Sequence, residues 1–146
     1  MKKIKQHPNT FATFLPVAWT SVFDVTKIEE LDNEWRVTLT EKENCIPEEL
    51  HGKDVVLNGY LPILELVDFP LRGKLLYLHF VRRRWKEAGG TVSYQNPDYQ
   101  FHPEGAKVTY DFGNFLKGLT RDEFDEFCLV WPSVRDCWEE DRCLVS

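Results

Sequence analysis

The chain has 146 residues, 42% of them hydrophobic and 14% aromatic, and it carries a net charge of -6. This length fits one domain with a buried core, residues 1–146, and the composition excludes an intrinsically disordered chain. No apolar run approaches the roughly 20 residues that cross a bilayer, and no apolar signal sequence follows the basic N-terminus, so we expect a cytoplasmic protein without membrane contact.

The first elements along the chain are a short helix and a β-hairpin. Between Phe11 and Ala18 the apolar residues are spaced as on one face of a helix, and Pro16 limits its length. Residues 23–31 and 34–42 alternate between apolar and polar side chains on either side of a polar turn at 32–33. This alternation predicts an antiparallel hairpin.

The middle of the chain predicts a helical turn and further strands. Residues 46–50, IPEEL, are typical of a single helical turn that begins at proline. Two apolar strands are predicted at 55–69 and 75–85, joined by a Pro/Gly turn at 70–74, and a third at 91–95. Together with the first hairpin they predict an antiparallel meander of about five strands.

The last third of the chain predicts helices. Val108, Phe112, Phe115 and Leu119 share one helical face, and Gly118 can end that helix. Thr120 and Glu123 form a capping box for a second helix, which ends before Pro132, and a short third helix follows. A short helix, then strands, then two to three C-terminal helices predict an α+β fold.

Sequence motifs give no support for an enzyme. The chain has no G-x-x-x-x-G-K-[ST], G-x-G-x-x-G, H-E-x-x-H or G-x-S-x-G. Its four cysteines and four histidines lack the spacing of metal ligands, so we expect no metal and no cofactor. His79 lies in an apolar strand, where a packed histidine is more common than a general base.

The strongest local feature is a basic segment in an acidic chain. Residues 68–86 contain six of the eighteen Lys and Arg residues and one acidic residue. The six are Arg72, Lys74, Arg82, Arg83, Arg84 and Lys86. Alternation on a strand places Arg82 and Arg84 on one side, with the turn cations about 30 Å away at roughly 3.3 Å per residue. Two separate positive points are therefore expected.

Two interpretations of this segment remain open on charge alone. Guanidinium groups match phosphate oxygens, a β-ribbon can enter a groove of DNA, and Trp85 or Tyr94 would stack on an exposed base. Alternatively, the charges protect an edge strand from aggregation, or they pair with the acidic helices. The overall acidity of the chain argues against general nucleic-acid affinity, so the charges favour neither interpretation.

Four segments follow one another in the chain: IPEEL, HGKDVVLNGYLPILELVDFPLRGK, YLHFVRRRW and PEGAKVTYDFGNFLK. In this order they resemble the N-terminal region of bacterial insertion-sequence transposases of the ISAon type. The family pattern contains E-K-N-x-I/P-P-E, D-F-P-[IL]-R-G-K, R-R-R-R-W and E-G-[TA]-[RK]-x-T-x-x-F-x-x-F-L-K. These pieces map onto Glu43–Glu49, Asp68–Lys74, Arg82–Trp85 and Glu104–Lys117. The resemblance covers roughly residues 12–120 and leaves 121–146 as an acidic helical extension.

The resemblance implies a non-catalytic module that recognises the DNA at the element ends and works with a separate catalytic subunit. The RNase H-like catalytic domain is not expected here, because about 25 residues follow the matched region. The residues that would contact DNA are Arg72, Lys74, Arg82, Arg83, Arg84 and Lys86, with Trp85 as packing or stacking support.

Three other possibilities stay open. The chain could be a protein-interaction module whose acidic C-terminal helices dock a partner such as the catalytic subunit. It could be a diverged transposase remnant that no longer binds DNA. A small enzyme or ligand-binding domain is the third possibility, for which the sequence offers no site.

Overall fold

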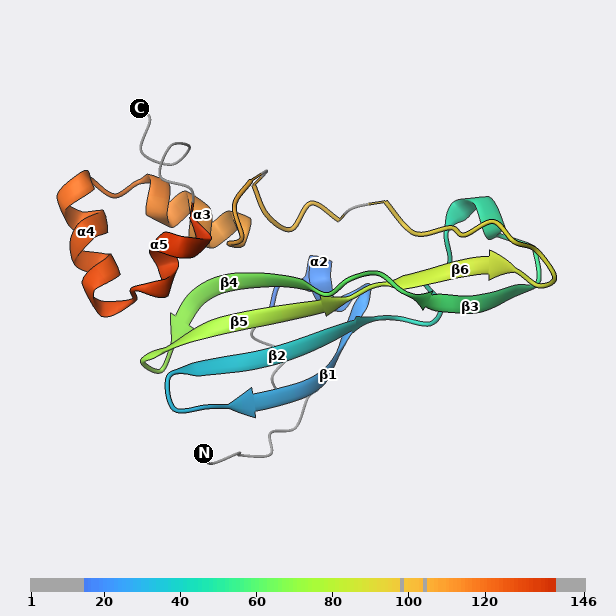
Figure 1. Ribbon diagram of the computed structural model, residues 1–146, viewed down its shortest axis with the longest axis horizontal. Coiled ribbons are helices and arrows are strands. Elements are labelled where there is room, and N and C mark those ends of the chain that lie inside the picture. The colour runs from blue at the N-terminus through green and yellow to red at the C-terminus, as the bar shows by residue number, and fades with distance from the viewer. Residues whose placement is uncertain (1–14, 98, 104, 139–146) are drawn as a thin grey trace.

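A computed structural model describes residues 15–97, 99–103 and 105–138 of the chain. Within these residues, six strands in two sheets and four helices confirm the predicted α+β class (Figure 1). The strands are β1 (Phe23–Glu30), β2 (Glu34–Glu41), β3 (Val55–Tyr60), β4 (Leu64–Leu71), β5 (Lys74–Val81) and β6 (Arg83–Glu87). The helices are α2 (Val17–Thr20), α3 (Tyr110–Lys117), α4 (Arg121–Val130) and α5 (Ser133–Cys137), with a 3-10 turn, η2, at Glu48–Leu50. Among the described residues, no helix combines the length and apolarity needed to cross a bilayer.

The main sheet has the strand order β1-β2-β5-β4. β1–β2 and β4–β5 are antiparallel hairpins, as predicted, but the two hairpins join through a parallel pairing of β2 with β5. The predicted single antiparallel meander is therefore wrong. Parallel neighbours need a long connection, and the chain between β2 and β5 supplies it by forming η2, β3 and β4.

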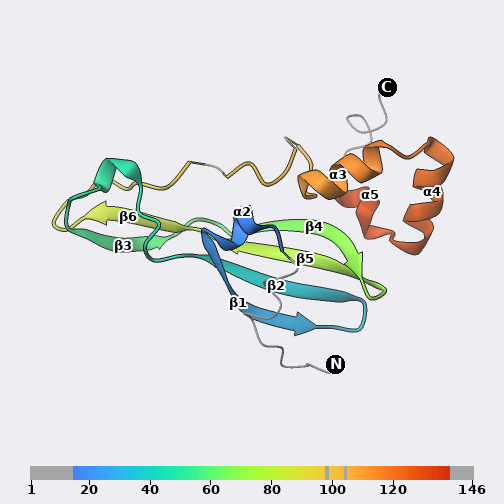
Figure 2. The same cartoon turned by 180° about the vertical axis from the view of Figure 1, so that it is seen from behind.

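The second sheet is a two-stranded antiparallel ribbon of β3 and β6, which we call the ribbon. Each of the two long predicted strands is divided: 55–69 breaks at 61–63, around Pro62, and 75–85 breaks at Arg82. Proline has no N–H to donate to a ladder, which explains the first break. The ribbon extends beyond one end of the main sheet, and α3–α5 lie at the other end (Figures 1 and 2).

Two further predictions about the strands need correction. Residues 91–95 do not form a third strand, because only Tyr94 makes a bridge, to Trp85. The turn predicted at 70–74 is shorter, since β4 continues to Leu71 and the chain reverses at Arg72 and Gly73. Both turn residues have positive φ, 51° and 79°, as a two-residue hairpin turn of type I′ requires.

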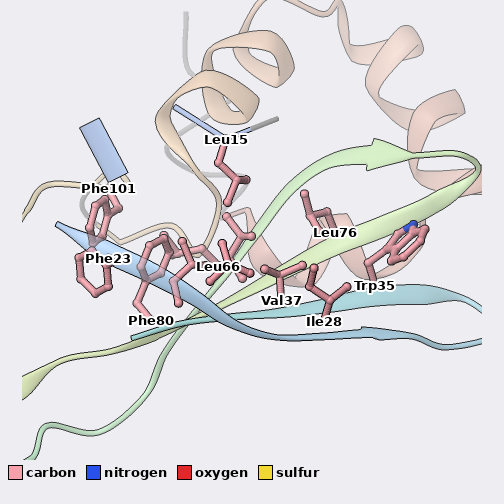
Figure 3. Packing of buried hydrophobic residues seen from close by; sticks show 12 residues of the cluster. Leu15, Phe23, Ile28, Trp35, Val37, Leu66, Leu76, Phe80 and Phe101 are labelled. Carbon is pink, nitrogen blue, oxygen red and sulfur yellow. The ribbon is translucent and has the colours of Figure 1, made fainter. Parts of the chain in front are cut away.

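One face of the main sheet carries the larger apolar core, because alternate residues of all four strands point to it (Figure 3). Aromatic rings close one end of this core: Phe80 stacks on Phe101 at 4.2 Å, and Trp19 of α2 meets both rings edge-on. The buried members are Leu15, Phe23, Val25, Ile28, Trp35, Val37, Leu39, Leu66, Leu76, Leu78, Phe80 and Phe101.

The helices form a second core on the β4 side of the sheet. Val67 and Leu75 of the sheet pack with Phe112 and Leu116 of α3 and Phe124 of α4. Residues of α4 and α5 thus share a core with the part of the chain covered by the family resemblance. The complete members are Val67, Leu75, Ala106, Val108, Phe112, Leu116, Phe124, Cys128, Val134 and Trp138.

The helix ends follow the sequence signals closely. The Thr120–Glu123 capping box is present with both hydrogen bonds, and Gly118 ends α3. The predicted apolar face of α3 is partly wrong, since Leu116 is buried and Phe115 is 42% exposed. At the N-terminus α2 starts after Pro16, and Ala18 is exposed rather than packed. Phe11 and Phe14 lie outside the described residues.

Candidate nucleic-acid interface

The six basic residues lie at opposite ends of β5, so the expected separation into two positive points is confirmed. Arg72 and Lys74 stand at the β4–β5 turn, and the other four follow the end of β5. Arg82 is the link to the ribbon, and β6 contains Arg83, Arg84 and Lys86. The cations at the two ends of β5 therefore have different neighbours.

At the turn, one of the two charges is compensated. Lys74 Nζ lies 2.8 Å from Glu30 Oε2 and 6.0 Å from the ring centroid of Trp35. Arg72 is exposed, and no carboxylate of the described residues lies within ion-pair distance of it. Arg72 is thus the cation of this end that can approach an anion without first breaking an ion pair.

Arg82 and Arg83 are tied to the junction between sheet and ribbon. Arg82 Nη2 donates to the carbonyl of Pro62 at 3.2 Å. The Arg83 backbone N–H donates to Glu41 Oε1 at 2.8 Å, and Arg83 Nε donates to the Glu41 carbonyl at 2.7 Å. The guanidinium of Arg83 also lies 5.9 Å from the ring centroid of Tyr60. These contacts assign Arg83 a structural role.

Glu41, which the sequence analysis missed, is the centre of this junction. Its side chain is 1% exposed and accepts hydrogen bonds from Arg83, from Asn96 Nδ2 at 3.0 Å and from the Tyr99 hydroxyl. Burial, then the hydrogen bond and charge of Glu41, raise the pKa of Tyr99. The sequence contained a signal for this role, because Glu41 lies two residues after Leu39, and every second residue of β2 points into the core.

Arg84 and Lys86 have different surroundings from Arg83. Among the described residues, no carboxylate lies within ion-pair distance of either side chain. Arg84 is exposed and Lys86 half-buried, and both point away from the face that carries Trp85, because residues alternate along a strand. The uncompensated cations of the segment are therefore Arg72, Arg84 and Lys86.

Trp85 is packed rather than presented to solvent. It is 6% exposed, it pairs with Leu57 across the ribbon, and its backbone N–H and C=O both bond to Tyr94 at 2.7 Å. Of the two roles expected for it, packing is the one that this position permits. Stacking on a base would require the indole to leave its site.

Two of the motifs that carry the resemblance meet in space. Asp68, from the D-F-P-L-R-G-K segment, accepts a hydrogen bond of 2.8 Å from the Thr109 hydroxyl. The Thr109 oxygen in turn accepts from the N–H of Phe112 and caps α3. Burial raises the pKa of Asp68, and the hydrogen bond from Thr109 offsets part of that rise. These motif residues therefore connect the sheet to the helices.

The compensated cations do not pair with the acidic helices, as one alternative expected. Lys74 and Arg83 engage Glu30 and Glu41, which belong to β1 and β2 rather than to the acidic helices. In the described part of the chain, no group of three or more His, Cys, Asp and Glu residues could hold a metal ion.

A hollow of about 540 Å³ lies beside the junction. It is lined by Leu64, Arg82, Tyr99, Gln100, Phe101, His102 and Tyr110.

Comparisons with protein families, with curated proteins and with solved structures found no match to this chain. The family resemblance therefore depends on the quoted motifs alone.

Proposed function

We propose that the chain is a non-catalytic DNA-binding module of an insertion-sequence transposase, which recognises element-end DNA and works with a separate catalytic subunit. It would act in the cytoplasm and take part in transposition, a form of DNA recombination. The observation that carries the proposal is a projecting two-stranded ribbon with two uncompensated cations, Arg84 and Lys86. A ribbon of this kind is one of the elements that proteins insert into a DNA groove.

The overall acidity of the chain limits its general affinity for DNA, but the basic residues are concentrated in one segment. Most acidic residues lie outside residues 68–86, which hold six basic residues and one acidic residue. Affinity for DNA depends on the phosphates that a local surface neutralises, and each contact contributes about 0.9 to the slope of log K against log salt. A small number of free cations predicts modest affinity and a shallow slope.

The test is a titration of fluorescently labelled duplexes with the full chain, followed by anisotropy at roughly 50 and 200 mM salt. One duplex carries the element end and the other a random sequence of equal length. We expect binding at low salt and a preference for the element end. No binding of either duplex at low salt would refute the proposal and leave the interpretation of the chain as a diverged transposase remnant without DNA binding.

Variants test whether DNA binds to the ribbon. The double substitution Arg84→Ala with Lys86→Ala should lower the salt slope by about 1 if only Lys86 contacts phosphate and by about 2 if both do, and Arg72→Ala should lower it by about 1 if the second positive point takes part. Lys117→Ala is the matched control, because Lys117 is an exposed cation of α3 at the other end of the molecule. An unchanged slope in the double variant would remove the ribbon from the interface.

A second candidate, the protein-interaction module, is favoured by an aromatic cluster on the helical end. Phe69 and Phe115 are 39% and 42% exposed, and their rings lie 5.7 Å apart. Phe127 contacts Phe115 at 5.7 Å, and the exposed carboxylates Asp111 and Glu126 belong to the same two helices. Co-purification with a transposase encoded by a neighbouring frame, lost on Phe115→Ser and retained on Lys117→Ala, would support this candidate.

A further inference from the structure

The two faces of the ribbon differ in charge and in packing. The register pairs Val56 with Lys86 and Leu57 with Trp85, so alternate residues are assigned to opposite faces. One face carries the packed Trp85 and the tethered Arg83. The other, which we call the free face, consists of Val56, Asn58, Arg84 and Lys86. The free face has two cations, no carboxylate and one apolar side chain, Val56, that is 41% exposed.

A β-bulge lies at the centre of the free face. The register shifts between Leu57 and Tyr60, so Asn58 and Gly59 of β3 lie opposite Arg84 alone. Gly59 has a φ of 83°, which is the left-handed region that glycine adopts without strain. Bulges of this kind change the direction in which neighbouring side chains point.

The Arg84 side chain lies across the bulge. A Cβ atom at Gly59 would stand 3.2 Å from Arg84 Nη2 and 4.0 Å from Nε, so the guanidinium occupies the space that a side chain at this position would fill. The missing side chain of Gly59 therefore gives Arg84 its path over the ribbon. A long side chain that is already confined loses less rotamer entropy when it binds a ligand.

The dimensions of the free face select one groove of DNA. Two paired strands lie about 4.8 Å apart and fit the major groove, about 12 Å wide, whereas the minor groove is about 6 Å wide. In the major groove, the favoured contact of an arginine is a bidentate pair with guanine O6 and N7. A lysine contributes a point charge to phosphates, and an exposed valine can contact a thymine methyl group.

We infer that the free face of the ribbon enters the major groove of duplex DNA, and that Arg84, aimed by the Gly59 bulge, reads a guanine while Lys86 contacts phosphate. This inference rests on the proposed function and adds to it the groove and the residue that determines specificity.

The experiment begins with selection from a pool of randomised duplexes by the full 146-residue chain. Affinities for the selected duplex and for a scrambled duplex are then measured at one salt concentration. Arg84→Lys keeps the charge and loses the planar fork, so it should leave scrambled-duplex affinity within about 2-fold and reduce discrimination by about 5- to 150-fold. Lys86→Ala, the matched control, should weaken both duplexes equally and lower the salt slope by about 1.

A modified DNA provides the second arm. Replacing the selected guanines by 7-deazaguanine removes the N7 acceptor, so it should lower the discrimination of the wild type more than that of the Arg84→Lys variant, because lysine lacks the planar fork that engages O6 and N7 together. Gly59→Ala should resemble Arg84→Lys, with folding checked by circular dichroism; if Gly59→Ala does not fold, Arg84→Lys and the modified DNA still decide the question.

The outcomes separate the inference from the proposed function. Wild-type protein that binds no duplex refutes the proposed function itself. Protein that binds DNA but enriches no sequence, or an Arg84→Lys variant that keeps full discrimination, overturns the inference and leaves DNA binding intact. Discrimination that is unchanged by 7-deazaguanine also overturns the inference, because a major-groove guanine contact requires N7.

Discussion

Replacing Glu41 by alanine should destabilise the chain strongly, although it removes an acidic residue from an acidic protein. The substitution takes away the acceptor of three donors: the Arg83 N–H, Asn96 Nδ2 and the Tyr99 hydroxyl. Asn96 keeps a second bond of 2.7 Å to the Cys45 carbonyl. Two donors, on Arg83 and Tyr99, thus lose the side-chain acceptor that holds them.

The magnitude follows from the cost of leaving these partly buried donors unpaired. A fully buried donor costs about 1–3 kcal/mol, so the pair costs at most roughly 2–6 kcal/mol. Removing a buried charge offsets part of this loss, because the charge no longer has to be desolvated in the folded state. We expect a decrease of about 3 kcal/mol in the free energy of unfolding, a large share of the roughly 5–15 kcal/mol that stabilises a domain.

The assay is urea unfolding followed by far-UV circular dichroism at pH 7, with the slope m fitted for every variant. Glu43→Ala is the matched control, since Glu43 is an exposed glutamate two residues further on, and its loss should cost less than about 0.5 kcal/mol. The loss in free energy of unfolding of Glu41→Gln should lie between those of Glu41→Ala and Glu43→Ala, because the amide keeps one acceptor oxygen but replaces the other with an NH2 donor. If Glu41→Ala unfolds at the same urea concentration as Glu43→Ala, the carboxylate does not hold the junction.

Three further predictions concern a phenol, a helix cap and a thiol. Since the pKa of Tyr99 is raised in the folded chain, the unfolded state loses the phenol proton first above about pH 10. The free energy of unfolding should therefore fall there by up to about 1.4 kcal/mol per pH unit. The fall should be smaller in Tyr99→Phe, and an equal fall in both proteins would refute the assignment. Thr120→Ala should cost about 1 kcal/mol in urea unfolding, because it removes the hydroxyl that accepts from the Glu123 N–H at the start of α4. Thr91→Ala, at an exposed loop position, should cost almost nothing, and equal costs would contradict the role of the cap. Burial raises the pKa of Cys137 to about 11, so at pH 8 its thiol should react with a disulfide reagent on the order of 100-fold more slowly than free cysteine. Mass spectrometry of the labelled peptide follows the reaction. Labelling at the rate of free cysteine would show that the thiol is not buried.

The position of Glu41 also affects the proposed function. Glu41 holds the backbone of Arg83, the first residue of β6, and therefore the start of the ribbon. Loosening this junction leaves Arg84 and Lys86 in place within the ribbon but frees the angle between ribbon and sheet. A variant at Glu41 that still folds is thus expected to weaken DNA binding without changing the number of phosphate contacts.

Features that depend on neighbouring residues could be predicted from the sequence. The polar turn after Glu30 specified the first hairpin, Thr120 with Glu123 specified the start of α4, and the order of elements specified the α+β class. Each signal lies within a few residues of the structure that it predicts, so distant parts of the chain do not alter it.

The way in which distant segments combine could not be predicted, because it depends on long-range pairing and packing. Alternation along β2 and β5 is the same in a parallel and an antiparallel pair, so the sequence could not reveal their parallel pairing. The position of Trp85 depends on its backbone bonds to Tyr94, and the bonds of Glu41 depend on Asn96 and Tyr99, which lie 55 and 58 residues further along the chain than Glu41. The sequence placed the charges of the basic segment along the chain, but which cations stay uncompensated depends on carboxylates that approach from strands about 40 residues away.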